Sequence, residues 1–81
     1  MTQDKVARIN LRIRAERARQ ERLHTGKTCA DGVTDGFRLS VLVEEVGEVA
    51  KAMQEGDRKN LKDELTQVAA VAVAWLESMD D

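Results

Sequence analysis

Apolar residues recur at helical spacing in three stretches of this 81-residue chain. The first stretch predicts a helix from about residue 2 or 4 to residue 23, with a thin apolar stripe made of Val6, Ile9, Ile13 and Leu23. The second predicts a helix from about Phe37 to Gln54, and the third predicts a helix that continues to about Met79. No stretch has the alternation typical of a strand. The expected fold class is all-α.

Two breaks separate the predicted helices. The segment TGKTCADGVTDGF, residues 25–37, holds three of the five glycines and has the composition of a loop. The segment EGDRKN, residues 55–60, predicts a turn in which Asp57 caps the third helix. We therefore expect one domain over residues 1–81, with a basic N-terminal helix at 1–24, a glycine-rich loop at 25–36 and a helical hairpin at 37–79.

The third helix carries the run VAAVAVAWL, residues 68–76, which is apolar on every side. Two neighbouring helices of one small protomer cannot cover so many faces, so the run predicts an interface between subunits. Pairing two hairpins gives a homodimer built as a four-helix bundle, or a higher oligomer. A partner also suits a chain of this length, because its core alone supplies little stability.

Composition narrows the expected environment. The longest apolar run has nine residues, whereas a membrane span needs about twenty. The N-terminus does not resemble a signal peptide. Cys29 is the single cysteine and cannot form an internal disulfide. We expect a soluble cytoplasmic protein with no membrane partner.

Charge is unevenly distributed along the chain. Residues 1–24 carry seven Lys or Arg against three Asp or Glu, a balance of +4, whereas residues 40–81 carry four against ten, a balance of −6. A basic first helix can contact phosphates, or it can be a solvated face that also pairs with the acidic half. The segment RIRAERARQER, residues 12–22, has no aromatic residue to stack on bases, so nucleic acid is not the expected partner.

Carboxylates interrupt the apolar stripes of the second and third helices. At about 100° per residue, Glu45 is flanked by apolar residues at positions 41, 49 and 52, and Glu64 by apolar residues at 68, 71 and 75. Glu48 falls at the edge of its stripe, and Glu44 lies farther round, towards solvent. A buried carboxylate without a partner costs free energy or takes up a proton, so these two acids require a compensating charge.

The predicted hairpin brings the acids together. If Gly56 marks the pivot, Glu45 lies level with Gln67, and Glu48 lies level with Glu64. Four oxygen-bearing side chains then converge, each helix contributing two at i, i+3 spacing. A cluster with a net charge of −3 repels itself unless a cation is bound, and oxygen ligands without His or Cys favour Mg²⁺ or Mn²⁺.

A second interpretation of the same acids needs no metal. An arginine of the first helix, such as Arg12 or Arg17, would pair with Glu45 or Glu64 in a buried salt bridge. Acidic residues on helices are also commonly solvated, so the segment EEVGE by itself is a weak indication. The matching acid on the other arm of the hairpin favours the metal site.

The segments EEVGEVAKAM and LKDELTQVAAVAVAWLE resemble the MazG-like all-α nucleoside triphosphate pyrophosphohydrolase family, whose signature is ExxE, a spacer and ExxD. The resemblance covers about residues 37–79, with the ExxE on Glu45 and Glu48 and the second motif beginning at Glu64. It implies protomers that dimerise, Mg²⁺ held by these acids, and hydrolysis of an NTP or dNTP to the monophosphate and pyrophosphate. The sequence departs from the signature at Gln67, where the family has Asp. An amide can still ligate Mg²⁺ but removes one negative charge, which implies a weaker or narrower hydrolase or a degenerate, non-catalytic relative.

Individual roles follow from position and chemistry. Glu48 has better access to solvent than Glu45 as a candidate general base. The expected catalytic residues are Glu48 and Glu45, and the expected metal ligands are Glu45, Glu48, Glu64 and Gln67, with Glu44 and Asp63 in second rank. The candidates for substrate binding are Lys51, Gln20, Asn60, Lys27 and Arg38. A non-catalytic helical interaction module stays open as the alternative function.

Overall fold

The computed structural model describes residues 2–23 and 33–80, and these residues form three α-helices and no strand. Helix α1 spans Thr2–Leu23, α2 spans Asp35–Glu55 and α3 spans Arg58–Met79. The predicted all-α fold class is confirmed. The predicted bounds hold closely for α1 and for the end of α3, whereas α2 begins two residues earlier than predicted.

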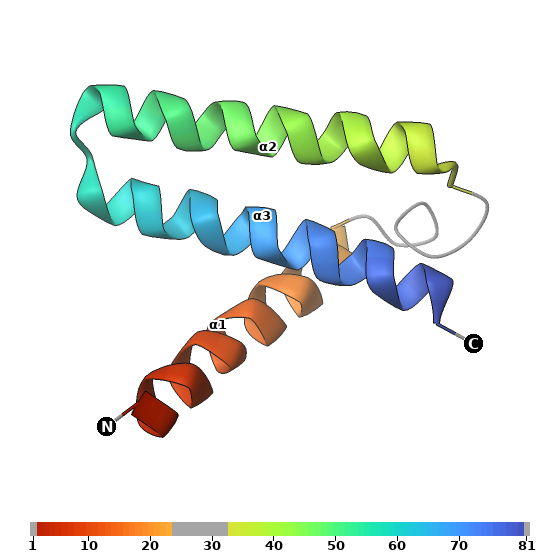
Figure 1. The fold of residues 1–81 in the computed structure, drawn as a ribbon, viewed down its shortest axis with the longest axis horizontal. Coiled ribbons are helices and arrows are strands. Elements are labelled where there is room, and N and C mark those ends of the chain that lie inside the picture. Colours follow the sequence, from red (N-terminus) through yellow and green to blue (C-terminus); the bar gives the residue numbers. More distant parts are fainter. Residues whose placement is uncertain (1, 24–32, 81) are drawn as a thin grey trace.

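Helices α2 and α3 lie side by side and run in opposite directions, as the predicted hairpin requires (Figure 1). Gly56 ends α2 in the left-handed conformation, with φ at 69°. The Gly56 N–H donates to the Met53 carbonyl at 3.1 Å, and the Asp57 N–H donates to the Ala52 carbonyl at 3.2 Å. This pair of bonds is the Schellman arrangement, in which glycine is favoured because it has no Cβ to oppose a positive φ.

The connection between α2 and α3 is shorter than predicted. Asp57 caps α3, because its Oδ1 accepts from the Asn60 N–H at 3.0 Å. The predicted cap is therefore confirmed, but Arg58, Lys59 and Asn60 already belong to the first turn of the helix. Only Gly56 and Asp57 separate the two helices.

The start of α2 is fixed by a second cap. Thr34 Oγ1 accepts from the Phe37 N–H at 3.1 Å, so Asp35 and Gly36 are helical rather than part of the predicted loop. The Trp75 indole N–H donates to Asp35 Oδ1 at 2.9 Å, which ties the end of α3 to the first turn of α2. The rest of the predicted glycine-rich loop, with Lys27 and Cys29, lies outside the described residues up to residue 32.

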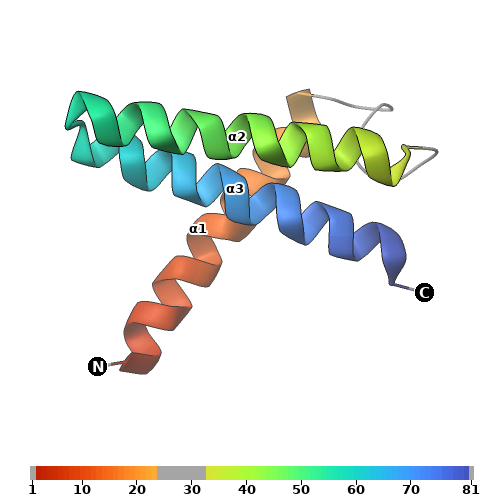
Figure 2. The same cartoon turned by 45° about the horizontal axis from the view of Figure 1, so that its top comes forward.

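Helix α1 packs against α3 rather than α2. It crosses α3, and its N-terminal end points away from the hairpin in both ribbon views (Figure 1 and Figure 2). Arg17 links the two helices at the crossing, because its Nε donates to Glu77 Oε1 of α3 at 2.8 Å. Within α1, its Nη2 also lies 2.8 Å from Glu21 Oε1. Ile13, Glu16, Arg17 and Gln20 are half-buried and form the face that α1 turns towards the rest of the chain.

The buried core of the described residues is small. Its apolar members are Ala52, Ala70 and Ala74, and no large side chain is fully buried. Much of the predicted stripe of α1 is exposed, because the N-terminal half of the helix leaves the hairpin. The exposed large apolar side chains include Val6, Ile9, Leu23, Phe37, Val43, Val46, Met53, Leu65, Leu76 and Met79. Within the described ranges, no helix has the length and hydropathy needed to cross a membrane.

Candidate functional site

Glu45 of α2 and Glu64 of α3 lie half-buried on the helix pair. One carboxylate oxygen of each, Oε2, is fully buried and has no hydrogen-bond partner. Leaving a buried acceptor unsatisfied costs about 1–3 kcal/mol, and more when the acceptor is charged. The flanking apolar residues that predicted a core-facing position for both acids were therefore a correct guide, and each acid lacks the partner that would offset its burial.

The electrostatic environment of Glu45 is acidic. Burial raises the pKa of Glu45 above its ordinary value, and the negative charge of Glu64 raises it further, followed by the charges of Glu48, Glu44 and Glu16. Both effects act in the same direction, because each disfavours the ionised carboxylate. A bound cation would reverse both, since it replaces lost hydration and neutralises the repulsion.

Three of the other four predicted ligands are more open to solvent than Glu45 and Glu64. Glu48, Glu44 and Asp63 are exposed, and Gln67 is half-buried one turn beyond Glu64 on α3. Asp63 lies 3.5 Å from the ammonium group of Lys59. Over residues 2–23 and 33–80, no three side chains among His, Cys, Asp and Glu lie close enough together to hold a metal ion.

The donor chemistry nevertheless fits a hard divalent cation. Two buried carboxylate oxygens without partners, from Glu45 and Glu64, are ligands of the kind that Mg²⁺ and Mn²⁺ prefer. Gln67, one turn beyond Glu64 on α3, carries an amide oxygen that is also a hard donor. Mg²⁺ usually keeps several waters and takes only one or two carboxylates, with substrate phosphates supplying further ligands. A site with two carboxylates and an amide therefore matches its needs.

The arginine interpretation of these acids is wrong for Arg17. Arg17 pairs with Glu21 and Glu77 instead of with Glu45 or Glu64. Among the residues that the structure describes, neither Glu45 nor Glu64 forms an ion pair with any lysine or arginine.

The residues predicted to bind substrate are scattered. Lys51 is exposed on α2, and Asn60 is half-buried in the first turn of α3, where its N–H serves the cap. Gln20 donates to Glu16 Oε2 at 3.3 Å, so its amide is engaged within α1. Arg38 is only 6% exposed, and its Nε and Nη2 atoms are buried without a partner. Lys27 lies outside the described residues. In this arrangement Arg38 is too buried to meet a ligand from solvent.

Two residues of α1 belong near the acids and were not predicted there. The pKa of Glu45, raised mainly by burial and by Glu64, is raised slightly further by the negative charge of Glu16. The pKa of Arg19 is raised mainly by its hydrogen bond to Glu16 and the charge of Glu16, and slightly by the charge of Glu45. Glu16 is largely buried, with 13% of its side chain exposed. Its spacing of three residues from Ile13 and four from Gln20 was the available signal, because it places Glu16 on the inward stripe of α1.

Glu16 and Arg19 line a groove of about 590 Å³ between α1 and α3, which we call the α1–α3 groove. Helix α1 contributes Arg12, Ala15, Glu16, Arg19 and Arg22 to its walls. Helix α3 contributes Asp63, Thr66 and Gln67. Gln67, one of the predicted metal ligands, is thus part of the groove wall.

A comparison with known protein families matches the hairpin part of the chain. The model of a family described as the MazG nucleotide pyrophosphohydrolase domain matches residues 37–80, which include α3, its cap and nearly all of α2. Searches of curated proteins and of solved structures found no match. The matched segment is more than half of the chain, and it contains Glu45, Glu48, Glu64 and Gln67. The chain therefore belongs to the MazG nucleotide pyrophosphohydrolase family.

Proposed function

We propose that this protein hydrolyses a nucleoside triphosphate, NTP or dNTP, to the monophosphate and pyrophosphate with the help of Mg²⁺, for which Mn²⁺ can substitute. Membership of the pyrophosphohydrolase family supports the reaction class. The observation that carries the proposal is the pair of buried, unpartnered oxygens, Oε2 of Glu45 and Oε2 of Glu64. A chain that needed only stability would fill these positions with apolar residues, since a buried acid without a partner destabilises the fold.

The proposed role of each side chain follows from its exposure to solvent. Glu45 and Glu64, which are half-buried, hold the divalent ion together with the amide of Gln67. When bound, the ion neutralises charge on the triphosphate and makes water more acidic. Glu48 is exposed one turn from Glu45 on α2, so it accepts the proton of the attacking water. Glu44 and Asp63, also exposed, hold waters around the site. The phosphoanhydride bond between the α and β phosphates breaks, and pyrophosphate leaves.

The test is an assay of pyrophosphate release with each of the common NTPs and dNTPs in Mg²⁺ or Mn²⁺. Glu45→Gln and Glu64→Gln keep the shape of the side chain and remove its charge, and each should lower kcat/KM by about a hundredfold or more. Glu55→Gln is the matched control, because Glu55 is exposed at the end of α2 and away from the site. If the wild type releases pyrophosphate and both site variants release it equally well, Glu45 and Glu64 are not the metal ligands. No release with any nucleotide by the folded wild type would refute the hydrolase.

The same proposal includes a homodimer. A single chain buries only alanines and one arginine among its described residues, while many large apolar side chains of all three helices are exposed. Exposed apolar patches of this extent are typical of protein interfaces. We expect the dimer to pair the hairpins as a four-helix bundle, so that folding and activity fall together on dilution.

Sedimentation velocity over a range of protein concentrations measures the mass, and circular dichroism at the same concentrations measures the helix content. The expected result is a dimer or higher oligomer that loses helix as it dissociates. A stable monomer with full helix content at the lowest concentration would contradict the oligomer.

A further inference from the structure

The α1–α3 groove has the side-chain charges of an anion site. Its walls carry three arginines, Arg12, Arg19 and Arg22, and two acids, Glu16 and Asp63, for a formal balance of +1. Both acids already face a cation, because Glu16 pairs with Arg19 and Asp63 lies 3.5 Å from a lysine one turn earlier. Arg12 is exposed and has no carboxylate partner in the described part of the chain. Positive charge is therefore available to a ligand.

One of these arginines is held in place. Arg19 donates from Nε to Glu16 Oε1 at 2.9 Å and from Nη2 to Glu16 Oε2 at 2.8 Å. This two-point contact fixes the plane of the guanidinium and leaves its Nη1 to donate elsewhere. An arginine whose orientation is already fixed loses less entropy on binding a phosphate oxygen.

The groove adjoins the proposed metal ligands through Gln67. Gln67 lines the groove and lies three residues after Glu64, and positions at i, i+3 are neighbours on a helix face. An Asp at position 67 would place a negative charge against an incoming anion, whereas the amide does not. The charges of Glu16 and Arg19 also act on Glu45, which places the wall of the groove within electrostatic reach of the acids.

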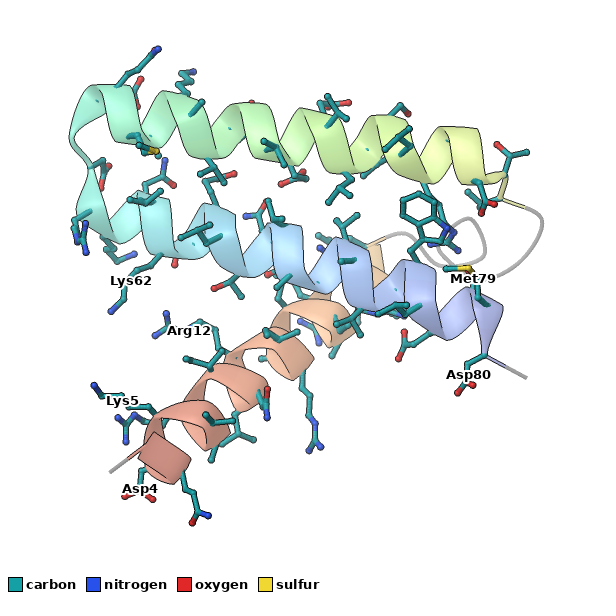
Figure 3. The ribbon with its side chains drawn as sticks, in the orientation of Figure 1. Asp4, Lys5, Arg12, Lys62, Met79 and Asp80 are labelled. Atoms are coloured by element: carbon teal, nitrogen blue, oxygen red, sulfur yellow. The ribbon has the colours of Figure 1, made fainter. Side chains whose placement is uncertain are left out.

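We propose that the α1–α3 groove binds the phosphate chain of the substrate, and that Arg12 and Arg19 carry this binding. The inference rests on the proposed function and deepens it, because it assigns the basic face of α1 to the triphosphate that the acids and Mg²⁺ hold at its other end. A triphosphate carries more negative charge than one divalent ion neutralises, and guanidinium groups match phosphate oxygens in both charge and geometry. In Figure 3 the side chains of Arg12 and Lys62 both project into the opening between α1 and α3, where a chain of phosphates would enter.

Calorimetric titration with inorganic tripolyphosphate in Mg²⁺-free buffer tests the groove without using the metal site. Arg12→Gln and Arg19→Gln should each weaken binding by about tenfold, which corresponds to about 1.4 kcal/mol. Arg14→Gln is the matched control, because it removes the same charge from an exposed position of α1 that does not line the groove. Arg12→Lys keeps the charge and should retain part of the affinity. Circular dichroism checks that every variant keeps the helix content of the wild type.

Each outcome decides the inference. It is overturned if tripolyphosphate does not bind the wild type, if the two groove variants bind it as well as the wild type does, or if Arg14→Gln weakens binding as much as they do. The last result would mean a general attraction to net charge.

An assay of nucleotide hydrolysis distinguishes binding by the groove from the chemical step. With Mg²⁺ present, Arg12→Gln and Arg19→Gln should raise KM by about tenfold and leave kcat within about twofold, since they remove binding rather than chemistry. If the wild type hydrolyses nucleotides and KM is unchanged in both variants, the groove proposal is refuted and the proposed function is retained. If the wild type hydrolyses no nucleotide but binds tripolyphosphate through these arginines, the hydrolase proposal is refuted and the groove proposal is retained.

Discussion

Replacing Glu45 with Gln should make the metal-free protein more stable, although it removes a residue of the proposed site. The wild-type carboxylate is half-buried, has a buried Oε2 without a partner, and is repelled by Glu64 across the helix pair. The Gln amide has almost the same volume and no charge. The substitution therefore removes the repulsion from Glu64 and leaves no buried, unpaired charge at position 45.

The size of the effect follows from the burial of this unpaired carboxylate. A buried acceptor without a partner costs about 1–3 kcal/mol, and more when it is charged. Both acids are only half-buried, so solvent screening reduces this to about 1 kcal/mol. For a domain of 60–100 residues, a change of 1 kcal/mol in the free energy of unfolding moves Tm by about 4–8 °C. Glu45→Gln should therefore melt several degrees above the wild type without Mg²⁺.

Divalent metal should remove this advantage. A ligand that binds only the folded state stabilises it by RT ln(1 + [L]/Kd), which is about 1.4 kcal/mol for 10 mM Mg²⁺ and a Kd near 1 mM. The wild type should gain this amount and Glu45→Gln should not. Thermal unfolding followed by circular dichroism, with and without Mg²⁺ and at one fixed protein concentration, measures both differences.

Two results would refute this reasoning. If Glu45→Gln melts below the wild type in metal-free buffer, the carboxylate has a favourable partner and its burial needs no cation. If Mg²⁺ raises Tm equally in wild type and variant, Glu45 is not a ligand. Glu55→Gln controls for the loss of one negative charge, and its effect should stay within about 0.5 kcal/mol, as is usual for an exposed position.

Three further predictions concern the same hairpin. Burial and neighbouring acids raise the pKa of Glu45 above its ordinary value of 4.5. The contribution of Glu45 to the stability of the folded state is therefore complete below that value and is lost as pH rises through the raised pKa. The Tm advantage of Glu45→Gln should thus be small at low pH and grow with pH, and a constant difference in Tm would contradict the pKa shift. Gln67→Asp gives the proposed site a third carboxylate ligand and should tighten Mg²⁺ binding in calorimetry by about tenfold, whereas unchanged affinity would place residue 67 outside the metal's reach. Arg38→Met removes two buried donors without partners and should raise stability by about 1 kcal/mol with KM unchanged, while a raised KM in the nucleotide assay would instead make Arg38 a substrate contact.

Much of the fold was predictable because its signals are local. The apolar periodicity of residues 41–53 and 61–76 predicts helices, and Gly56 followed by Asp57 marks both the end of one helix and the cap of the next. The start of α2 was missed because the cap is Thr34, which lies inside a segment of loop composition. The exposed stripe of α1 was missed because periodicity shows which residues share a face and not whether another helix covers that face.

The candidate site, like the fold, was predictable from the sequence only in part. The half-burial of Glu45 and Glu64 was predictable from their apolar neighbours on each helix, because a carboxylate within an apolar stripe faces the partner helix. The contribution of Glu16 and Arg19 was not, since it depends on where α1 crosses α3, and no repeat along the chain encodes that crossing. The burial of Arg38 was hidden for a related reason, because long charged side chains are usually expected at the surface.

The two-residue connection of Gly56 and Asp57 sets which side chains of α2 and α3 share a level. One additional residue inside α3 before Glu64 would advance the following residues by about 1.5 Å and turn them by about 100°, which would carry that carboxylate off the face opposite Glu45. Among the described residues only alanines form the fully buried apolar core, so no fully buried large side chain there would resist the new alignment. The length of this hairpin is thus as much a determinant of the acidic pair as the acids themselves, and a redesign that lengthens it by a single residue would remove the pair without altering either glutamate.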